Sequence, residues 1–254
     1  MTNYVRVETL SGARYCEVEN QTLWVLDAAP WWVGARRTEE SLPLQGARLL
    51  APSEASKIVC VGQNYRKHAA EMGKPIPEEP LLFLKPPSAL NGAGQPIVLP
   101  PESKEVHHEA ELALVIGERL TRVGEAEAAR GIFAVSCFND VTARDIQKRE
   151  IQHTRAKSYD TFACCGPWMV RGLSPNDLRV QARVNGQPRQ DGRTSDMIFP
   201  PARLVSFISH VMTLMPGDLI STGTPSGVGR LEAGDLVEIE IEGIGVLGNP
   251  VIRR

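Results

Sequence analysis

Short segments in which apolar and polar residues alternate fill the first fifty positions of the chain. The segments YVRVETL, RYCEVEN and TLWVLD are separated by Gly, Asn and Pro residues. A period of two is the pattern of a half-buried β-strand, and the intervening residues favour turns. We therefore predict a small β-meander appendage at residues 1–52, whose core Trp24, Trp31 and Trp32 would close. Residues 53–254 are expected to form a second, larger domain.

In the middle of the chain, continuous apolar runs alternate with segments whose apolar residues have the spacing of a helix. Residues 57–61 and the segment IFAVSCF are typical of buried strands. Three short helices are predicted for YRKHAAEMGKP, GEAEAARG and NDVTARDIQKRE, the last with Asn139 or Asp140 near its N-cap. A longer amphipathic helix is predicted for PPARLVSFISHVMTL, which begins with Pro and is followed by Pro216-Gly217.

The C-terminal part of the chain returns to strands. RVQARV runs into Asn185-Gly186, a dipeptide that favours a hairpin turn, and DLISTGTP and DLVEIEIEG predict two more strands. Earlier, residues 74–101 are too rich in proline for one long helix. There we expect a loop around a short strand at residues 81–85, which would serve as a lid or wall of an active site. The whole pattern predicts a β-rich α+β fold.

Two glutamates open the strand predicted within HHEAELALVIG, at residues 107–117. Because alternate residues of a strand point the same way, Glu109 and Glu111 would lie side by side. Like charges repel there, and their desolvation is costly. Either both carboxylates face water at a solvated strand edge, or a divalent cation lies between them. Oxygen ligands of this kind favour Mg²⁺, Mn²⁺ or Ca²⁺.

Asp140 is a candidate for the third carboxylate that such a metal site needs. Its place after an apolar run also fits a helix N-cap, which is a sufficient reason for Asp there. On a helix, Asp140, Arg144 and Gln147 would share one face. An Arg and a Gln beside a metal ligand would suit a substrate carboxylate. Arg144 could equally pair with Asp140 or with Asp145.

Three further polar residues could carry out chemistry. His68 and Glu71 lie three residues apart and would share one side of a short helix, either as a general-base pair or as a surface ion pair. Lys157 lies close to an apolar run and could stabilise an oxyanion or simply be exposed. Thr224 lies in GTPSGVG, which lacks the Gly-Lys-[Ser/Thr] of a phosphate loop but could present its hydroxyl and backbone N–H groups to an anion.

The composition of the chain argues against several classes of protein. The 254 residues carry a net charge of −2, which gives no reason to propose nucleic acid or an anionic membrane as a partner. No apolar run is long enough to span a bilayer, and the start lacks the pattern of a signal peptide, so we expect a cytoplasmic location. Five cysteines without a Cys-x-x-Cys motif fit a reducing compartment and argue against a structural zinc site.

Five motifs occur in an order that resembles the fumarylacetoacetate hydrolase family. They are IVCVGQNYRKHAAE, HHEAELALVIG, FNDVTARDIQ, AKSYDTFACCGPW and PGDLISTGTPSGVG, and together they span roughly residues 57–250. The resemblance implies a mixed β-roll, to which the N-terminal β appendage is added. It also implies a homodimer.

The same resemblance implies a metal site in this chain. Glu109, Glu111 and Asp140 would bind one Mg²⁺ or Mn²⁺ per subunit, with water completing the coordination shell. His107 would share a face with Glu109 and lie near the site without being a ligand.

Roles for the remaining candidates follow from the resemblance as well. The implied catalytic residues are His68, Glu71 and Lys157. The implied substrate-binding residues are Arg144, Gln147 and Thr224.

The chemistry implied is the metal-dependent conversion of a small 2-oxo or 2,4-dioxo acid. We expect C–C bond hydrolysis of an acylpyruvate, since His68 and Glu71 could activate the attacking water. Oxaloacetate decarboxylation would use the same metal ligands. Isomerisation or decarboxylation of the dioic acids formed in aromatic catabolism would use them too. The sequence therefore leaves both alternatives to hydrolysis open. A different kind of function is also possible in principle: a non-catalytic subunit that has the family fold but no activity.

Overall fold

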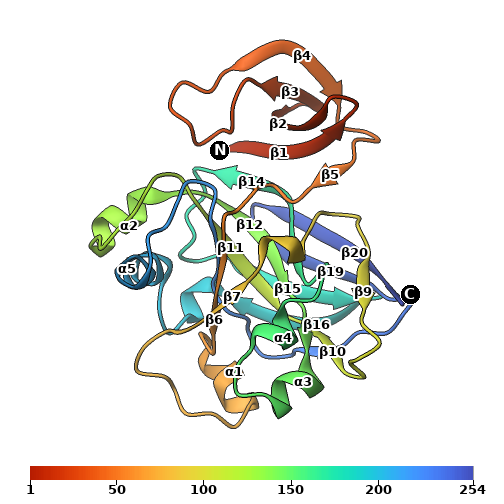
Figure 1. The fold of residues 1–254 in the computed structure, drawn as a ribbon, viewed down its shortest axis with the longest axis vertical. Coiled ribbons are helices and arrows are strands. Elements are labelled where there is room, and N and C mark those ends of the chain that lie inside the picture. The colour runs from red at the N-terminus through yellow and green to blue at the C-terminus, as the bar shows by residue number, and fades with distance from the viewer. Residues whose placement is uncertain (254) are drawn as a thin grey trace.

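Strands are the main regular elements of the structure, a computed structural model that describes residues 1–253 (Figure 1). The largest sheet has twelve strands in the order β4-β3-β2-β1-β14-β12-β11-β17-β6-β7, with β5 paired to β1 and β8 to β14. Its strands are β1 (Thr2–Thr9), β2 (Gly12–Glu19), β3 (Thr22–Leu26), β4 (Arg37–Pro43), β5 (Leu49–Leu50), β6 (Ile58–Gly62), β7 (Leu81–Lys85), β8 (Leu90–Asn91), β11 (Ala110–Ile116), β12 (Ile132–Asp140), β14 (Ala163–Arg171) and β17 (Leu219–Ser221).

Two smaller sheets and the helices complete the fold. A five-stranded sheet runs in the order β16 (Gln187–Arg193), β15 (Arg179–Val184), β19 (Leu236–Ile241), β20 (Gly245–Arg253) and β9 (Ile97–Leu99). A three-stranded sheet consists of β13 (Thr142–Ala143), β10 (Val106–His108) and β18 (Gly229–Arg230). The helices are α1 (Arg66–Glu71), α2 (Glu125–Gly131), α3 (Arg144–Arg149), α4 (Thr154–Lys157) and α5 (Pro201–Val211), with 3₁₀ turns at Pro87–Ala89 and Thr194–Asp196.

The β-rich α+β fold predicted from the sequence is confirmed. Strands β1 to β4 lie at one end of the long axis, and α1, α3 and α4 gather at the other end (Figure 1). Within the described residues, 1–253, no helix combines the length and the apolar character that crossing a membrane requires.

The predicted N-terminal meander is present, but its core differs from the prediction. Strands β1 to β4 pair antiparallel in sequence order, and β1 also pairs with β14, so the meander continues the large sheet. The small apolar core beneath it consists of Val5, Val7, Cys16, Leu23 and Val25. The tryptophans do not close this core: Trp32 is exposed, and Trp31 packs against Tyr15 and Phe133. The division at residues 52 and 53 stays a prediction.

Strand β11 passes through the middle of the protein. It pairs antiparallel with β12 on one side and with β17 on the other, and every one of its residues is buried. Leu112 and Leu114 belong to one apolar core, whereas Ala113 and Val115 belong to another. The sheet is therefore covered on both faces here, which holds the polar start of the strand rigidly.

One predicted helix begins later than the sequence pattern suggested. The strand β12 continues to Asp140, and α3 begins only at Arg144, with Ala143 as its N-cap residue. The prediction of Asn139 or Asp140 as N-cap was therefore wrong, and Asp140 does not share a helix face with Arg144. The cause is the ladder to β11, in which Ala110 pairs with Asn139 and keeps this segment extended.

Other local predictions are confirmed. Residues Asn185 and Gly186 both have positive φ, 53° and 74°, and join β15 to β16 in the predicted hairpin. Both central residues of a type I′ turn require this conformation. Strand β7 occupies the predicted residues within the proline-rich segment 74–101. Whether that segment acts as a lid stays a prediction.

Candidate active site

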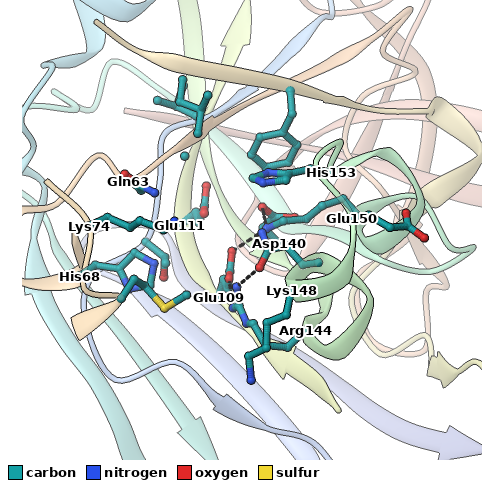
Figure 2. A pocket seen from close by; sticks show the side chains of 18 of the residues that line it. Gln63, His68, Lys74, Glu109, Glu111, Asp140, Arg144, Lys148, Glu150 and His153 are labelled. Atoms are coloured by element: carbon teal, nitrogen blue, oxygen red, sulfur yellow. Dashed lines mark hydrogen bonds and ion pairs between the residues drawn. The ribbon is translucent and has the colours of Figure 1, made fainter. Parts of the chain in front are cut away.

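A cavity of about 540 Å³ collects the candidate residues at the end of the molecule where α1, α3 and α4 lie. All of the predicted site residues line it except Glu71, which contacts the lining residue His68. Further lining residues that the sequence did not single out include Gln63, Lys74, Phe83, Lys148, Glu150 and His153. Figure 2 shows His68 on one side of the carboxylates and His153 on the other.

Three carboxylates meet at the centre of this cavity. Oxygen atoms of Glu109, Glu111 and Asp140 lie within 4.8 Å of one another, and all three residues are buried. The pairing of β11 with β12 brings them together, since Glu111 pairs with Phe138 and the Asp140 N–H donates to the Glu109 carbonyl at 2.9 Å. Such a cluster could hold a metal ion.

Three cationic side chains contact two of these carboxylates. The Lys157 ammonium donates to Glu109 at 2.8 Å and to Asp140 at 2.6 Å. Lys85 also donates to Asp140, and Arg144 donates to Glu109. Glu111 instead accepts from the Ser221 hydroxyl and from the Gly223 N–H.

The environments of the two glutamates separate their pKa values. Burial alone would raise the pKa of Glu109, but Lys157 and Arg144 outweigh it and hold that pKa well below its usual range. Burial raises the pKa of Glu111 well above its usual value, and the charges of Asp140 and Glu109 raise it further. The ionised form of Glu111 therefore lacks a compensating charge.

A divalent cation fits this set of donors. The three acidic side chains offer only hard oxygen ligands, as Mg²⁺, Mn²⁺ and Ca²⁺ prefer. A cation between them would also supply the positive charge that Glu111 lacks. The site thus explains how two buried glutamates can stand next to each other at the start of an apolar strand.

The His68–Glu71 pair forms as the i, i+3 spacing predicted. His68 Nδ1 lies 2.9 Å from a Glu71 carboxylate oxygen, and the other oxygen of Glu71 accepts the Gly227 N–H at 3.0 Å. Because a carboxylate can only accept, His68 Nδ1 carries a proton, so in the neutral imidazole Nε2 is the acceptor. His68 is buried and lines the cavity, whereas its partner Glu71 is exposed.

Lysine 157 is held as an ammonium group inside the cavity. Burial would lower its pKa, but Asp140 and Glu109 outweigh burial and raise the pKa above its usual value. Its Nζ lies 4.8 Å from the centre of the Phe83 ring, and His153 meets the same ring edge-on at 5.4 Å. The alternative of an exposed Lys157 is therefore wrong.

Lys85 is a site residue that sequence reasoning missed. It is fully buried and donates to Asp140 and, at 3.1 Å, to the Val141 carbonyl. Its sequence signal was available, because in the predicted strand LLFLK the residues Phe83 and Lys85 are two apart and share a face. A lysine that shares the face of an apolar strand with an aromatic ring indicates a buried partner of opposite charge.

Gln147 and Thr224 line the cavity but already have partners. Gln147 accepts from Arg144, its i−3 neighbour on α3. The Thr224 hydroxyl donates to the Ala110 carbonyl at 2.9 Å and accepts from Gln190 at 2.7 Å. An anion would therefore meet the backbone at Thr224 rather than its hydroxyl proton. His107 does not line the cavity and contacts Glu105 at 3.2 Å.

Asp140→Ala is expected to destabilise the metal-free protein strongly. The change leaves the buried Lys85 and Lys157 ammonium groups without Asp140, and breaking a buried ion pair typically costs about 3–5 kcal/mol. Urea unfolding of the metal-free proteins measures the free energy of unfolding. The matched control is Asp191→Ala, which removes a carboxylate from an exposed pair with Arg179 and should have a much smaller effect. Equal losses in both variants would contradict the buried ion cluster.

Comparisons with known proteins place the chain in a family. The family model for the fumarylacetoacetate (FAA) hydrolase C-terminal domain matches residues 57–252, and an Rv2993c-like N-terminal model matches residues 3–52. The protein Rv2993c of Mycobacterium tuberculosis is 51% identical over 220 residues, which cover 85% of this chain and 83% of that protein. Oxaloacetate tautomerase YisK of Bacillus subtilis is 43% identical over 213 residues, covering 79% and 71%.

A solved structure matches the whole chain. The 2-hydroxyhepta-2,4-diene-1,7-dioate isomerase from Mycobacterium marinum superposes with a TM-score of 0.93 at 44% identity, over 100% of this chain and 99% of that chain. The range matched by the family model, residues 57–252, includes all five sequence motifs. The chain therefore belongs to the fumarylacetoacetate hydrolase family.

Proposed function

We propose that the protein is a divalent-metal-dependent enzyme that moves a proton at C3 of a 2-oxo acid, as a tautomerase or isomerase does. The observation that carries this proposal is that His68, which contacts Glu71, lines the same cavity as the three carboxylates. The names of two relatives support the reaction class, since one is an oxaloacetate tautomerase and the other a dioate isomerase.

The proposed ligands of the cation are Glu109, Glu111 and Asp140, and the proposed cation is Mg²⁺ or Mn²⁺. When bound, such a cation supplies a Lewis acid that polarises the 2-oxo group and makes C3 more acidic. Lys157 keeps its ammonium charge between Glu109 and Asp140, where it can donate to negative charge that develops on the substrate.

His68 is the proposed base. Its Nε2 accepts the proton from C3, while Glu71 holds the imidazole through Nδ1. The electron pair of the broken C–H bond becomes the C2=C3 double bond, and the C=O π pair moves onto the 2-oxo oxygen. That oxygen takes up a proton from solvent to give the enol, and His68 Nε2 releases the C3 proton to solvent. In the reverse direction His68 Nε2 returns the proton to C3, which restores the keto acid.

Arg144, which lines the cavity, is a candidate partner for a substrate carboxylate. Within residues 1–253, the buried Arg144 Nε has no hydrogen-bond partner, although the other two guanidinium nitrogens contact Gln147 and Glu109. A buried N–H without an acceptor is costly, so a shift of the Arg144 side chain that brings Nε to an anionic substrate would be favourable. This favours a 2-oxo acid over a neutral ketone.

Hydrolysis of an acylpyruvate, the reaction expected from the sequence, is the second candidate. The same His68 Nε2 could take a proton from water that attacks C4, after which C–C cleavage leaves its electron pair on C3 of the pyruvate unit. Oxaloacetate decarboxylation would share the cation site and needs no attacking water. The homodimer and the cytoplasmic location inferred from the sequence stay predictions.

Metal-dependent tautomerisation of oxaloacetate is the expected result for the purified protein. The assay follows the loss of enol absorbance with Mg²⁺ or Mn²⁺, and acetylpyruvate is tested in parallel for pyruvate release. A chelator should reduce the rate to that of buffer, since the carboxylates alone supply no Lewis acid. Metal-dependent pyruvate release from acetylpyruvate alone would favour the hydrolase instead. No metal-dependent rate with either substrate would contradict the proposal and favour a non-catalytic family member.

A further inference from the structure

Gln190, in strand β16, joins two parts of the candidate site without lining the cavity. The residue is buried, and its amide makes four hydrogen bonds to described residues. Its Oε1 accepts the Ala110 N–H at 2.9 Å, and Ala110 lies between Glu109 and Glu111. Its Nε2 donates to the Thr224 hydroxyl at 2.7 Å and to the Pro225 carbonyl at 2.8 Å.

Backbone groups on both sides fix the orientation of this amide. The Ala110 N–H can only donate and the Pro225 carbonyl can only accept, so the oxygen of Gln190 must face β11 and its nitrogen must face Pro225. His108 Nδ1, at 3.1 Å from Oε1, must then carry a proton. Every hydrogen-bonding position of the amide is used.

The segment on the nitrogen side of Gln190 also contacts the His68–Glu71 pair. Residues 222–227 include Thr224, Pro225 and Gly227, and the Gly227 N–H donates to Glu71. Gly227 has a φ of +99°, and a Cβ there would lie 2.2 Å from the Arg189 carbonyl, so this segment rests directly on β16 beside Gln190. Asn64, just before α1, donates to the Thr222 carbonyl at 2.7 Å. Helix α1 is thus tied to the segment at both ends.

We propose that Gln190 is a positioning residue that fixes the distance between the His68–Glu71 pair and the carboxylates of Glu109 and Glu111. The inference rests on the proposed function for its catalytic consequence. Sheet pairing of β11 holds the carboxylates, and Thr222, Gly223 and Thr224 bond directly to β11 or to Glu111. Gln190 holds the next residue, Pro225, which leads to Gly227 and its bond to Glu71. Loss of Gln190 should therefore displace the base and leave the metal ligands in place.

Gln190→Met tests this separation of effects, because methionine keeps the side-chain length without the hydrogen bonds. We expect the turnover number to fall by about 10²-fold, the size associated with a misplacement of roughly 1 Å. The dissociation constant for Mn²⁺, measured by calorimetry, should be unchanged. Hydrogen–deuterium exchange should become faster in peptides that cover residues 64–72 and 222–229 and stay the same in the peptide that covers residues 110–116.

The matched control is Asn249→Leu. Asn249 is an equally buried amide whose nitrogen donates to the Gly92 and Gln95 carbonyls, both at 2.8 Å, and it does not line the cavity. This variant should lose stability but keep its turnover number. If Gln190→Met does not fold, Gln190→Glu keeps the acceptor for the Ala110 N–H and removes the donors to Thr224 and Pro225, and the same exchange pattern is expected.

Two results would overturn the inference. One is unchanged exchange in residues 222–229, which would mean that Gln190 does not hold this segment. The other is a parallel loss of Mn²⁺ affinity and turnover, which would mean a general structural role. Because exchange and metal binding are measured without substrate, both readouts stay valid if no activity is found, and failure of the proposed function is distinguishable from failure of this inference.

Discussion

Glu111→Gln is expected to abolish Mn²⁺ binding and turnover and, at neutral pH, to stabilise the metal-free protein. A neutral amide removes the repulsion from Asp140 and Glu109 that raises the pKa of Glu111. Its oxygen can still accept from the Ser221 hydroxyl and the Gly223 N–H, and its nitrogen can donate toward the neighbouring carboxylates. Titration with Mn²⁺ and thermal unfolding of the metal-free proteins measure the two effects.

The stabilisation by Glu111→Gln should depend on pH with a definite sign. The pKa of Glu111 is raised in the folded state, so the wild-type carboxyl contributes stability at acid pH that is lost as the pH rises toward its folded pKa. The gain of the glutamine variant should therefore be absent in acid and grow toward neutral pH. Glu39→Gln, at an exposed position in β4, is the control and should change neither property. Retained Mn²⁺ binding in Glu111→Gln would contradict the assignment of the metal site.

His68→Asn is expected to reduce turnover by about 10²–10⁴-fold, the contribution typical of general acid–base catalysis. The change removes the Nε2 lone pair that the proposed mechanism requires, but it removes no ligand of the carboxylate cluster. The Mn²⁺ dissociation constant should therefore stay close to that of the wild type. Steady-state rates with oxaloacetate and calorimetric titration with Mn²⁺ together measure this separation.

Glu71→Gln is the partner variant for His68→Asn. It keeps an oxygen that can accept from His68 Nδ1 or from the Gly227 N–H, but it removes the charge that stabilises the protonated imidazole. The loss of turnover should be smaller than that of His68→Asn. A His68→Asn protein with wild-type turnover would show that another group moves the proton.

Local sequence patterns were sufficient for much of the fold and the site. The alternation at residues 1–52, the Asn185-Gly186 turn and the spacing of His68 and Glu71 all act over a few residues, and the structure contains each of them. The spacing of Glu109 and Glu111 was equally informative, since strand geometry alone places the two carboxylates together.

What could not be predicted depends on contacts between distant segments. Asp140 looked like a helix N-cap because the sequence around it does not reveal the ladder between β11 and β12. The partners of Lys85 and Gln190 could not be identified because they lie 55 and 80 positions away in the chain, at Asp140 and Ala110. Trp32 was assigned to a core because the sequence does not show that the meander is packed by small aliphatic residues instead.

The most direct test of the central claim is the decay of oxaloacetate enol absorbance in a stopped-flow instrument, with and without Mg²⁺. Wild-type protein, His68→Asn and Glu111→Gln are compared at equal concentration. The account predicts a fast decay for the wild type that a chelator abolishes, and decay at the buffer rate for both variants, although His68→Asn still binds the metal. A wild-type rate that is indifferent to the chelator, or a His68→Asn rate equal to that of the wild type, would contradict it.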